Sequence, residues 1–443
     1  MDQILISLAI VMAVAVVAPL ISAVVSRFLR IPIAVLEMSL GLLVGPGVLA
    51  LVTDRTLIQS IATIGAWFLF YGAGYETDFS AMKGRLLTTA TGSWLLCLAL
   101  SIGAGVLVAT LLLAPVAGTT PLVSGIFIGA AITSTGLGTI LPMMRDADEI
   151  DTRVGRAVIA SGIVGQFAPL IALAVLVGRF ATPWALLFHL IYFAAIAGLC
   201  WIARKGLPRF AATAQTATLD AGGQFGIRMQ LFICFAAVAL GQLIGINVAI
   251  GAFCAGIIAQ MLLGKTPTGE RKVIDRKLKS IIYGAFLPIF FINAGLTFDL
   301  PGIIAQGAAA FALIPLFFIM KLILRGIVGS ATLSRYTGLS SKTPLSKIPD
   351  GEAPTFRGRV VPAGVAWRER ASTSLLVGTG LAAVIMIAQM GYESGALTSV
   401  TASALEGAGM MTALIFPTIA LNLSRQARVL AASSAHPEHY KPL

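Results

Sequence analysis

The sequence has few charged residues for its length. Only 11% of its 443 residues are Asp, Glu, Lys or Arg, whereas 57% are hydrophobic. A soluble globular domain carries about 25% charged residues. This shortage excludes a large soluble enzyme and a disordered chain, and four cysteines are too few for a secreted disulfide scaffold. The mean hydropathy of +0.92 instead indicates a polytopic membrane protein.

The sequence also lacks the patterns of a metal centre or an intramembrane enzyme. Its four cysteines all fall in apolar segments and form no CxxC pair, so we interpret them as packing residues. It contains no HExxH motif, no paired aspartates within an apolar segment and no plausibly placed Ser/His pair. We therefore expect no enzymatic activity, no cofactor and no resident metal.

The apolar segments predict an all-α fold with about 13 transmembrane helices. A bilayer core about 30 Å thick needs about 20 apolar residues per helix. The candidate segments are residues 3–26, 31–51, 57–75, 86–115, 120–143, 154–178, 182–203, 226–245, 247–263, 280–297, 302–328, 372–391 and 400–423. The first eleven fall within residues 1–331 and the last two within 372–425. A proline-containing polar linker (332–371) and a short tail (426–443) are both expected in the cytosol.

The basic residues predict the orientation of these segments. The chain has 31 Lys and Arg against 19 Asp and Glu, a formal net charge of +12. If the segments alternate, 27 of the 31 cations lie on one side and only Arg55 and Arg179 on the other. Cytoplasmic loops carry the excess of Lys and Arg, so we predict an external N-terminus and a cytoplasmic C-terminus. The excess therefore encodes topology, and no nucleic-acid partner is expected.

The segments also predict an inverted repeat of six helices. The thirteen segments can be divided into six, one connector and another six. Equivalent segments of the two halves are then seven apart, and because seven is odd they cross the membrane in opposite directions, as in secondary transporters. The fifth segment contains the Ser/Thr/Gly-rich stretch 131–138, and the twelfth contains Gly378-Thr379-Gly380. The second and ninth segments match in a similar way through the glycine-rich stretches 41–45 and 251–256.

Glycines and hydroxyl residues at mid-membrane allow a helix to unwind and free its carbonyl groups for an ion. The alternative is close helix packing through small residues, which is common in membranes. Because these stretches recur seven segments apart, we favour two broken, crossing helices. Thr133, Ser134, Thr135 and Thr379 then become candidate ion-site residues.

Four stretches, in this order and spacing, resemble a known family over almost the whole chain. Residues 31–46 resemble its "IP…GE…AGILLGP" stretch, 74–78 its "GLELD" motif, 245–256 its "LG…LGAFLAGLL" pattern and 290–299 its "FFVxVGLxLD" motif. The chain thus resembles the monovalent cation:proton antiporters of the second superfamily branch, which include Na+/H+ antiporters and K+ efflux relatives.

This resemblance implies both a fold and an activity. It implies a homodimer in the plasma membrane, with a dimerisation domain and a mobile core domain that holds the two crossed helices. It also implies alternating-access exchange of Na+ or K+ for protons, through an aspartate on the sixth segment.

The sequence departs from the family at that aspartate. Family members read "GR…(Q/D/N)D", whereas here Gly155-Arg156 is followed by Gly165-Gln166, which places Gln166 at the aspartate position. An amide oxygen accepts a cation but cannot carry the exchanged proton. The alternative reading is therefore a diverged relative that moves an ion or small solute without proton coupling.

Two cations within the eleventh segment are not explained by topology. Lys321 and Arg325 lie one turn apart, and a charge within the membrane is costly and marks a functional site by default. The resemblance places a basic residue at Lys321 beside the unwound helices, and we expect it to neutralise helix dipoles or to titrate. The alternative is that both side chains extend to the cytoplasmic surface, which we favour for Arg325. For Glu37, in the second segment, we favour a structural or path-lining role over ion binding.

Overall fold

The residues that the computed structural model describes form helices joined by turns and short loops, without strands among them. The described residues are 2–25, 31–76, 85–113, 118–177, 191–192, 194–196, 198–199, 201–203, 213–215, 217–218, 224–243, 248–263, 268–331 and 363–435. Among them, ten helical stretches are long and apolar enough to cross a membrane, and Ile33–Val44 and Val248–Leu263 are shorter apolar helices. The all-α membrane fold is confirmed, whereas the number thirteen stays a prediction.

The chain divides into two compact units. Unit 1 comprises Met1–Val24, Ile33–Asp78 and Leu170–Phe298, and unit 2 comprises Val25–Pro32, Phe79–Pro169 and Asp299–Leu443. More than half of the seventh predicted segment (182–203), including its first nine residues, and most of the linker 332–371 lie outside the described residues.

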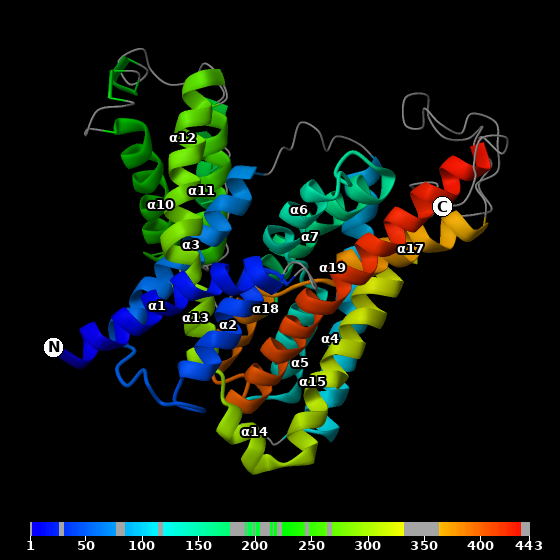
Figure 1. The fold of residues 1–443 in the computed structure, drawn as a ribbon. Coiled ribbons are helices and arrows are strands. Elements are labelled where there is room, and N and C mark those ends of the chain that lie inside the picture. Colours follow the sequence, from blue (N-terminus) through cyan, green and yellow to red (C-terminus); the bar gives the residue numbers. More distant parts are fainter. Residues whose placement is uncertain are drawn as a thin grey trace. The chain divides into compact units, whose positions relative to one another are not determined.

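Unit 1 is a set of closely packed helices. Its α3 and α11 run side by side, and α13 packs against both α2 and α3 (Figure 1). Its described helices are α1 (Asp2–Val25), α2 (Ile33–Val44), α3 (Thr56–Glu76), α10 (Phe225–Leu243), α11 (Val248–Leu263), α12 (Thr268–Ile281), η1 (Ile282–Phe286) and α13 (Leu287–Thr297).

Glycines in the second and ninth segments serve this packing. A methyl group at Gly41 would lie 2.2 Å from the carbonyl oxygen of Ile292, and one at Gly256 would lie 2.1 Å from that of Tyr71. Both glycines lie in continuous helices, so neighbouring backbones approach where the side chain is missing. Here the small-residue packing interpretation is correct, and neither helix is broken.

Unit 2 contains the two broken helices that the sequence predicts. In it α4 packs along α5, and α17 lies beside α19 (Figure 1). Its helices are α4 (Arg85–Leu111), α5 (Pro121–Thr133), α6 (Leu137–Asp146), α7 (Arg153–Leu176, in this unit up to Pro169), α14 (Leu300–Gln306), α15 (Ala308–Met320), η2 (Lys321–Val328), α17 (Ala363–Gly378), α18 (Ala382–Glu393) and α19 (Ser399–Ala435).

Two helices of unit 2 extend past the predicted ends of their apolar segments. The linker was predicted to extend to residue 371, but α17 already begins at Ala363. The tail was predicted from 426, but α19 continues to Ala435. Both differences have the same cause: a helix continues past the apolar core of a membrane segment into polar residues, and hydropathy detects only the core.

Candidate functional site

The site begins with the interruption of one helix by residues 134–136. α5 starts with Pro121 in its first turn, where the missing N–H costs nothing, and ends at Thr133. Ser134 is then extended (φ −69°, ψ 147°), and α6 begins after Gly136. Ser and Thr hydroxyls compete for backbone groups, and glycine weakens a helix, so this stretch unwinds.

A second interruption, at residues 379–381, lies against the first. α17 ends at Gly378 and α18 begins at Ala382. The N–H of Gly136 donates to the carbonyl oxygen of Thr379 at 2.9 Å, and the Thr135 hydroxyl donates to that of Val377 at 2.7 Å. The two breaks therefore cross in direct contact, as the repeat pattern predicts.

The ammonium group of Lys321 lies at the C-terminal end of α5, among its free carbonyl groups. Its Nζ donates to the carbonyl oxygens of Ser134 at 2.7 Å, Ala131 at 3.0 Å and Ile132 at 3.1 Å. The Ser134 hydroxyl oxygen is a fourth neighbour at 3.3 Å. Three carbonyl partners need three N–H groups, so this geometry is that of the charged ammonium. The side chain is 1% exposed, and the positive charge lies at the negative end of the α5 helix dipole.

Arg325 is also buried, and the expectation that it extends to the cytoplasmic surface is wrong. The side chain is 0% exposed. Its Nε donates to the Thr135 hydroxyl at 3.0 Å and its Nη2 to the carbonyl oxygen of Ser161 at 2.8 Å. Arg325 thus links η2 to the first break and to α7.

The burial of Arg325 depends on the absence of a side chain at position 165. A methyl group on Gly165 would lie 2.4 Å from Nη2 of Arg325 and 2.6 Å from Oγ1 of Thr135. The guanidinium therefore uses the space beside the residue that precedes Gln166. A sequence pattern cannot reveal this, because it shows which residue is small but not what occupies the vacated volume.

Gln166 lies in α7, and its side chain reaches the start of α6. Its Oε1 accepts a hydrogen bond from the N–H of Leu137 at 3.3 Å, and the side chain is 4% exposed. The neighbouring carbonyl of Gly165 accepts from the N–H of Thr135 at 2.9 Å. The Gln166 amide thus accepts a hydrogen bond from a free N–H group at the positive end of α6. A carboxylate at this position would accept the same hydrogen bond and add a negative charge.

The remaining predicted residues differ in their surroundings. Thr133 and Thr379 lie at the two breaks, but each donates its hydroxyl to carbonyl oxygens of its own helix. Glu37 lies in α2 of unit 1, 5% exposed, whereas the other predicted site residues all lie in unit 2. The sequence analysis missed Thr412, whose Oγ1 accepts from the N–H of Gly380 at 3.3 Å. A lone threonine in an apolar helix carries no signal of this role.

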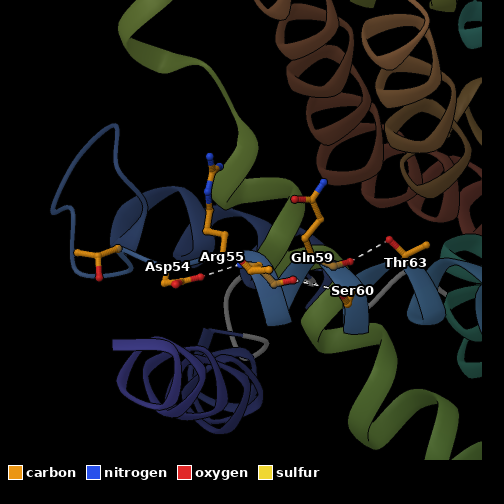
Figure 2. Close-up of a pocket in the computed structure, with 7 residues that line it drawn as sticks. Asp54, Arg55, Gln59, Ser60 and Thr63 are labelled. Carbon is orange, nitrogen blue, oxygen red and sulfur yellow. Dashed lines mark hydrogen bonds between the residues drawn. The ribbon is translucent and has the colours of Figure 1, made fainter. Parts of the chain in front are cut away.

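Unit 1 has a separate polar hollow at the beginning of α3 (Figure 2). In it the N–H of Thr56 donates to Oδ1 of Asp54 at 2.9 Å, and Arg55 donates to the carbonyl oxygen of Leu296 at 3.0 Å. Hydrogen bonds from Thr56, the backbone N–H first, lower the pKa of Asp54. The hollow is lined by Thr53, Asp54, Arg55, Thr56, Gln59, Ser60 and Thr63. It contains no predicted site residue.

Comparison with known proteins decides the family. The family model described as "Sodium/hydrogen exchanger, transmembrane" matches residues 12–421, almost the whole chain. The chain belongs to the sodium/hydrogen exchanger family.

Relatives in this family agree with that assignment. The chain is 24% identical to the Na(+)/H(+)-K(+) antiporter GerN of Bacillus cereus over 319 residues, which are 69% of this chain and 74% of GerN. It is 28% identical over 330 residues, 72% of the chain, to the putative Na(+)/H(+) antiporter YjbQ of Bacillus subtilis, of which it spans only 51%. These matches make the chain a transporter of the cation:proton exchange class.

A solved structure supports the same fold. The sodium proton antiporter MjNhaP1 of Methanocaldococcus jannaschii superimposes with a TM-score of 0.61 and 14% sequence identity, covering 98% of this chain and 100% of that one. The chain therefore shares the fold of that antiporter over 98% of its length.

Proposed function

We propose that this exchanger couples its cation to protons through Lys321. The observation that carries the proposal is the set of three carbonyl oxygens around its Nζ, at 2.7 to 3.1 Å. Unwound backbone carbonyls are also the groups that coordinate Na+ in secondary transporters. The protonated lysine is thus a tethered cation that occupies the ligands of the transported one.

Competition follows from this arrangement. When Lys321 loses a proton, the neutral amine no longer balances the carbonyl dipoles, and a Na+ or K+ ion takes its place there. When the ion leaves, the lysine binds a proton again. Lys321 by itself accounts for one proton per cation, because the ammonium and the transported ion carry the same charge.

We also propose alternating access, in a protein that is dimeric and lies in the plasma membrane. The two breaks, Lys321 and Arg325 all belong to unit 2, so that unit is the one that would carry the ion across. The basic residues support an external N-terminus and a cytoplasmic C-terminus by the positive-inside rule. The printed names of the relatives support Na+ and K+ as the candidate cations.

Everted membrane vesicles test this function. Respiration acidifies their lumen and quenches a trapped pH probe, and addition of Na+ or K+ is expected to restore the fluorescence as protons leave. If vesicles that hold their gradient show no response to Na+, K+ or Li+, the proposal of proton-coupled exchange is contradicted. The result would then favour a carrier without proton coupling.

Replacing Gln166 with Asp is expected to strengthen exchange. A carboxylate at this buried position adds a charged oxygen at the start of α6, and a charge-assisted interaction is worth about 1.4 kcal/mol, or about tenfold in apparent cation affinity. The concentration of Na+ or K+ that gives half-maximal dequenching measures the effect. Gln166→Asn is the matched control, because it has the same shape as Asp without the charge and should give no gain. Equal affinities for the two variants would contradict the expectation.

A further inference from the structure

One buried carboxylate of unit 2 is not used by the function proposed above. Glu406 begins the third turn of α19 and is 3% exposed. Its carboxyl group forms no hydrogen bond and no ion pair with any residue that the structure describes. Burial of a carboxylate without partners is costly, and far more costly for the ionised form than for the neutral acid.

Glu406 lies on the face of α19 that packs against the second helix break. Gly409 follows Glu406 by three residues and Thr412 follows Gly409 by three, so each successive pair lies on neighbouring positions of the helix surface. A methyl group on Gly409 would lie 3.1 Å from the carbonyl oxygen of Gly380, and the Thr412 hydroxyl lies 3.2 Å from the same oxygen. Glu406 is therefore one helical turn, about 5 Å along the axis, from the contact with the break.

The same glycine connects this face to the Lys321 site. A methyl group on Gly380 would lie 3.1 Å from Nζ of Lys321 and 3.0 Å from the carbonyl oxygen of Ser134. The backbone of Gly380 thus lies between the ammonium group of Lys321 and helix α19. Glu406 and Lys321 lie on opposite sides of the break, in one compact unit.

The charged group that contacts α19 on the same turn is Asp299, the residue before α14: its Oδ2 accepts a hydrogen bond from the Ser399 hydroxyl, and its N–H donates to the Ser403 hydroxyl at 2.8 Å. In the described part of the helices that pack on α19, the other charged side chains lie away from Glu406. α14 and α15 contain no Asp, Glu, Lys or Arg. α18 carries charge only at Glu393, in its exposed last turn, and its Tyr392 is exposed as well. The charged residues of the other packed helices lie near their ends away from the breaks: Arg368, Glu369 and Arg370 in α17, and Arg145 and Asp146 in α6.

We propose that Glu406 is a second proton-binding residue of the transport cycle, so that each cycle moves two protons against one cation. This inference rests on the function proposed for Lys321. In the conformation described, the ammonium of Lys321 and the neutral acid of Glu406 together hold two exchangeable protons. When the site takes up a cation, the lysine becomes a neutral amine and the acid a carboxylate, and both protons pass to water. The cation-loaded form then has one positive charge fewer than the protonated form, so exchange moves net charge.

Charge movement tests this inference. The full chain is reconstituted into liposomes, and the proton flux and the transport current are both measured after a Na+ or K+ concentration jump. The wild-type protein is expected to give a current, with a ratio of two protons per cation. Glu406→Gln, which keeps the shape, is expected to retain cation-dependent proton flux at a ratio of one and to lose the current. Glu393→Gln, the same change at an exposed position of α18, should keep both.

The possible failures are distinguishable. A ratio of one in the wild-type protein would overturn the role of Glu406 without any variant, and so would an unchanged current in Glu406→Gln. The absence of any cation-dependent proton flux in the wild-type protein would instead contradict the proposed function as a whole.

Discussion

Replacing Lys321 with Arg is expected to abolish cation-dependent proton movement while leaving the fold intact. A guanidinium still offers N–H donors to the carbonyl oxygens of Ala131, Ile132 and Ser134, so the helix break remains satisfied. Arginine, however, does not release its proton. Its ordinary pKa exceeds that of lysine by at least about two units, which lowers the deprotonated fraction at least about 100-fold. Exchange, measured by dequenching in everted vesicles, should fall by a similar factor.

Lys279→Arg provides the matched control for this change. Lys279 lies in α12 of unit 1, partly exposed, and forms an ion pair with Glu76 at 2.8 Å. Arginine preserves that pair, and the carbonyl ligands of unit 2 are untouched, so exchange should continue. If Lys321→Arg exchanged at the wild-type rate with an unchanged pH profile, Lys321 could not be the proton carrier.

Gly165→Ala is expected to destabilise unit 2 by about 1–3 kcal/mol, the usual cost of overpacking. The added methyl group would lie 2.4 Å from Nη2 of Arg325 and 2.6 Å from the Thr135 hydroxyl, so at least one must move. Either movement weakens a buried hydrogen bond, from Arg325 to Thr135 or to Ser161. Thermal unfolding of the purified protein in detergent measures the loss.

A second glycine in unit 2 separates steric from conformational effects. Gly92 lies within α4, and a methyl group there would meet nothing within 4 Å. Gly92→Ala should therefore be neutral or stabilising, by up to about 1 kcal/mol, since alanine is the better helix former.

Adding Arg325→Lys to Gly165→Ala should cost less stability than the sum of the two single changes, because the two residues are in contact. Equal stability of Gly165→Ala and the wild-type protein would refute the proposed packing.

The broken helices were predictable because their chemistry is local. Hydroxyl residues and glycine cluster at residues 133–136 and again at 378–380, within otherwise apolar segments, and the hydroxyl residues distinguish these stretches from the glycine-rich stretches that only pack. In the second and ninth segments a similar signal marks close approach instead, as at Gly41 beside Ile292. Sequence does not separate the two cases when hydroxyl residues are missing, because glycine favours both.

The surroundings of single side chains were not predictable. Arg325 was expected at the surface because it lies one turn closer to the end of its segment than Lys321. It is buried instead because Gly165, 160 residues away in the sequence, leaves room for the guanidinium. Glu406 could not be singled out for the same reason: it lies near the start of α19 in the sequence, and only the structure shows that its side chain is 3% exposed, on the helix whose Gly409 contacts the break at Gly380.

The release of protons when the purified protein binds its cation tests the central claim most directly. In weakly buffered detergent solution with a pH-sensitive dye, added Na+ or K+ should displace protons in a saturable manner. The account predicts this release for the wild-type protein. In Lys321→Arg it predicts that the side chain at position 321 keeps its proton. Saturable cation binding by the wild-type protein without any release of protons would show that the cation and the Lys321 ammonium do not compete, which would contradict the account.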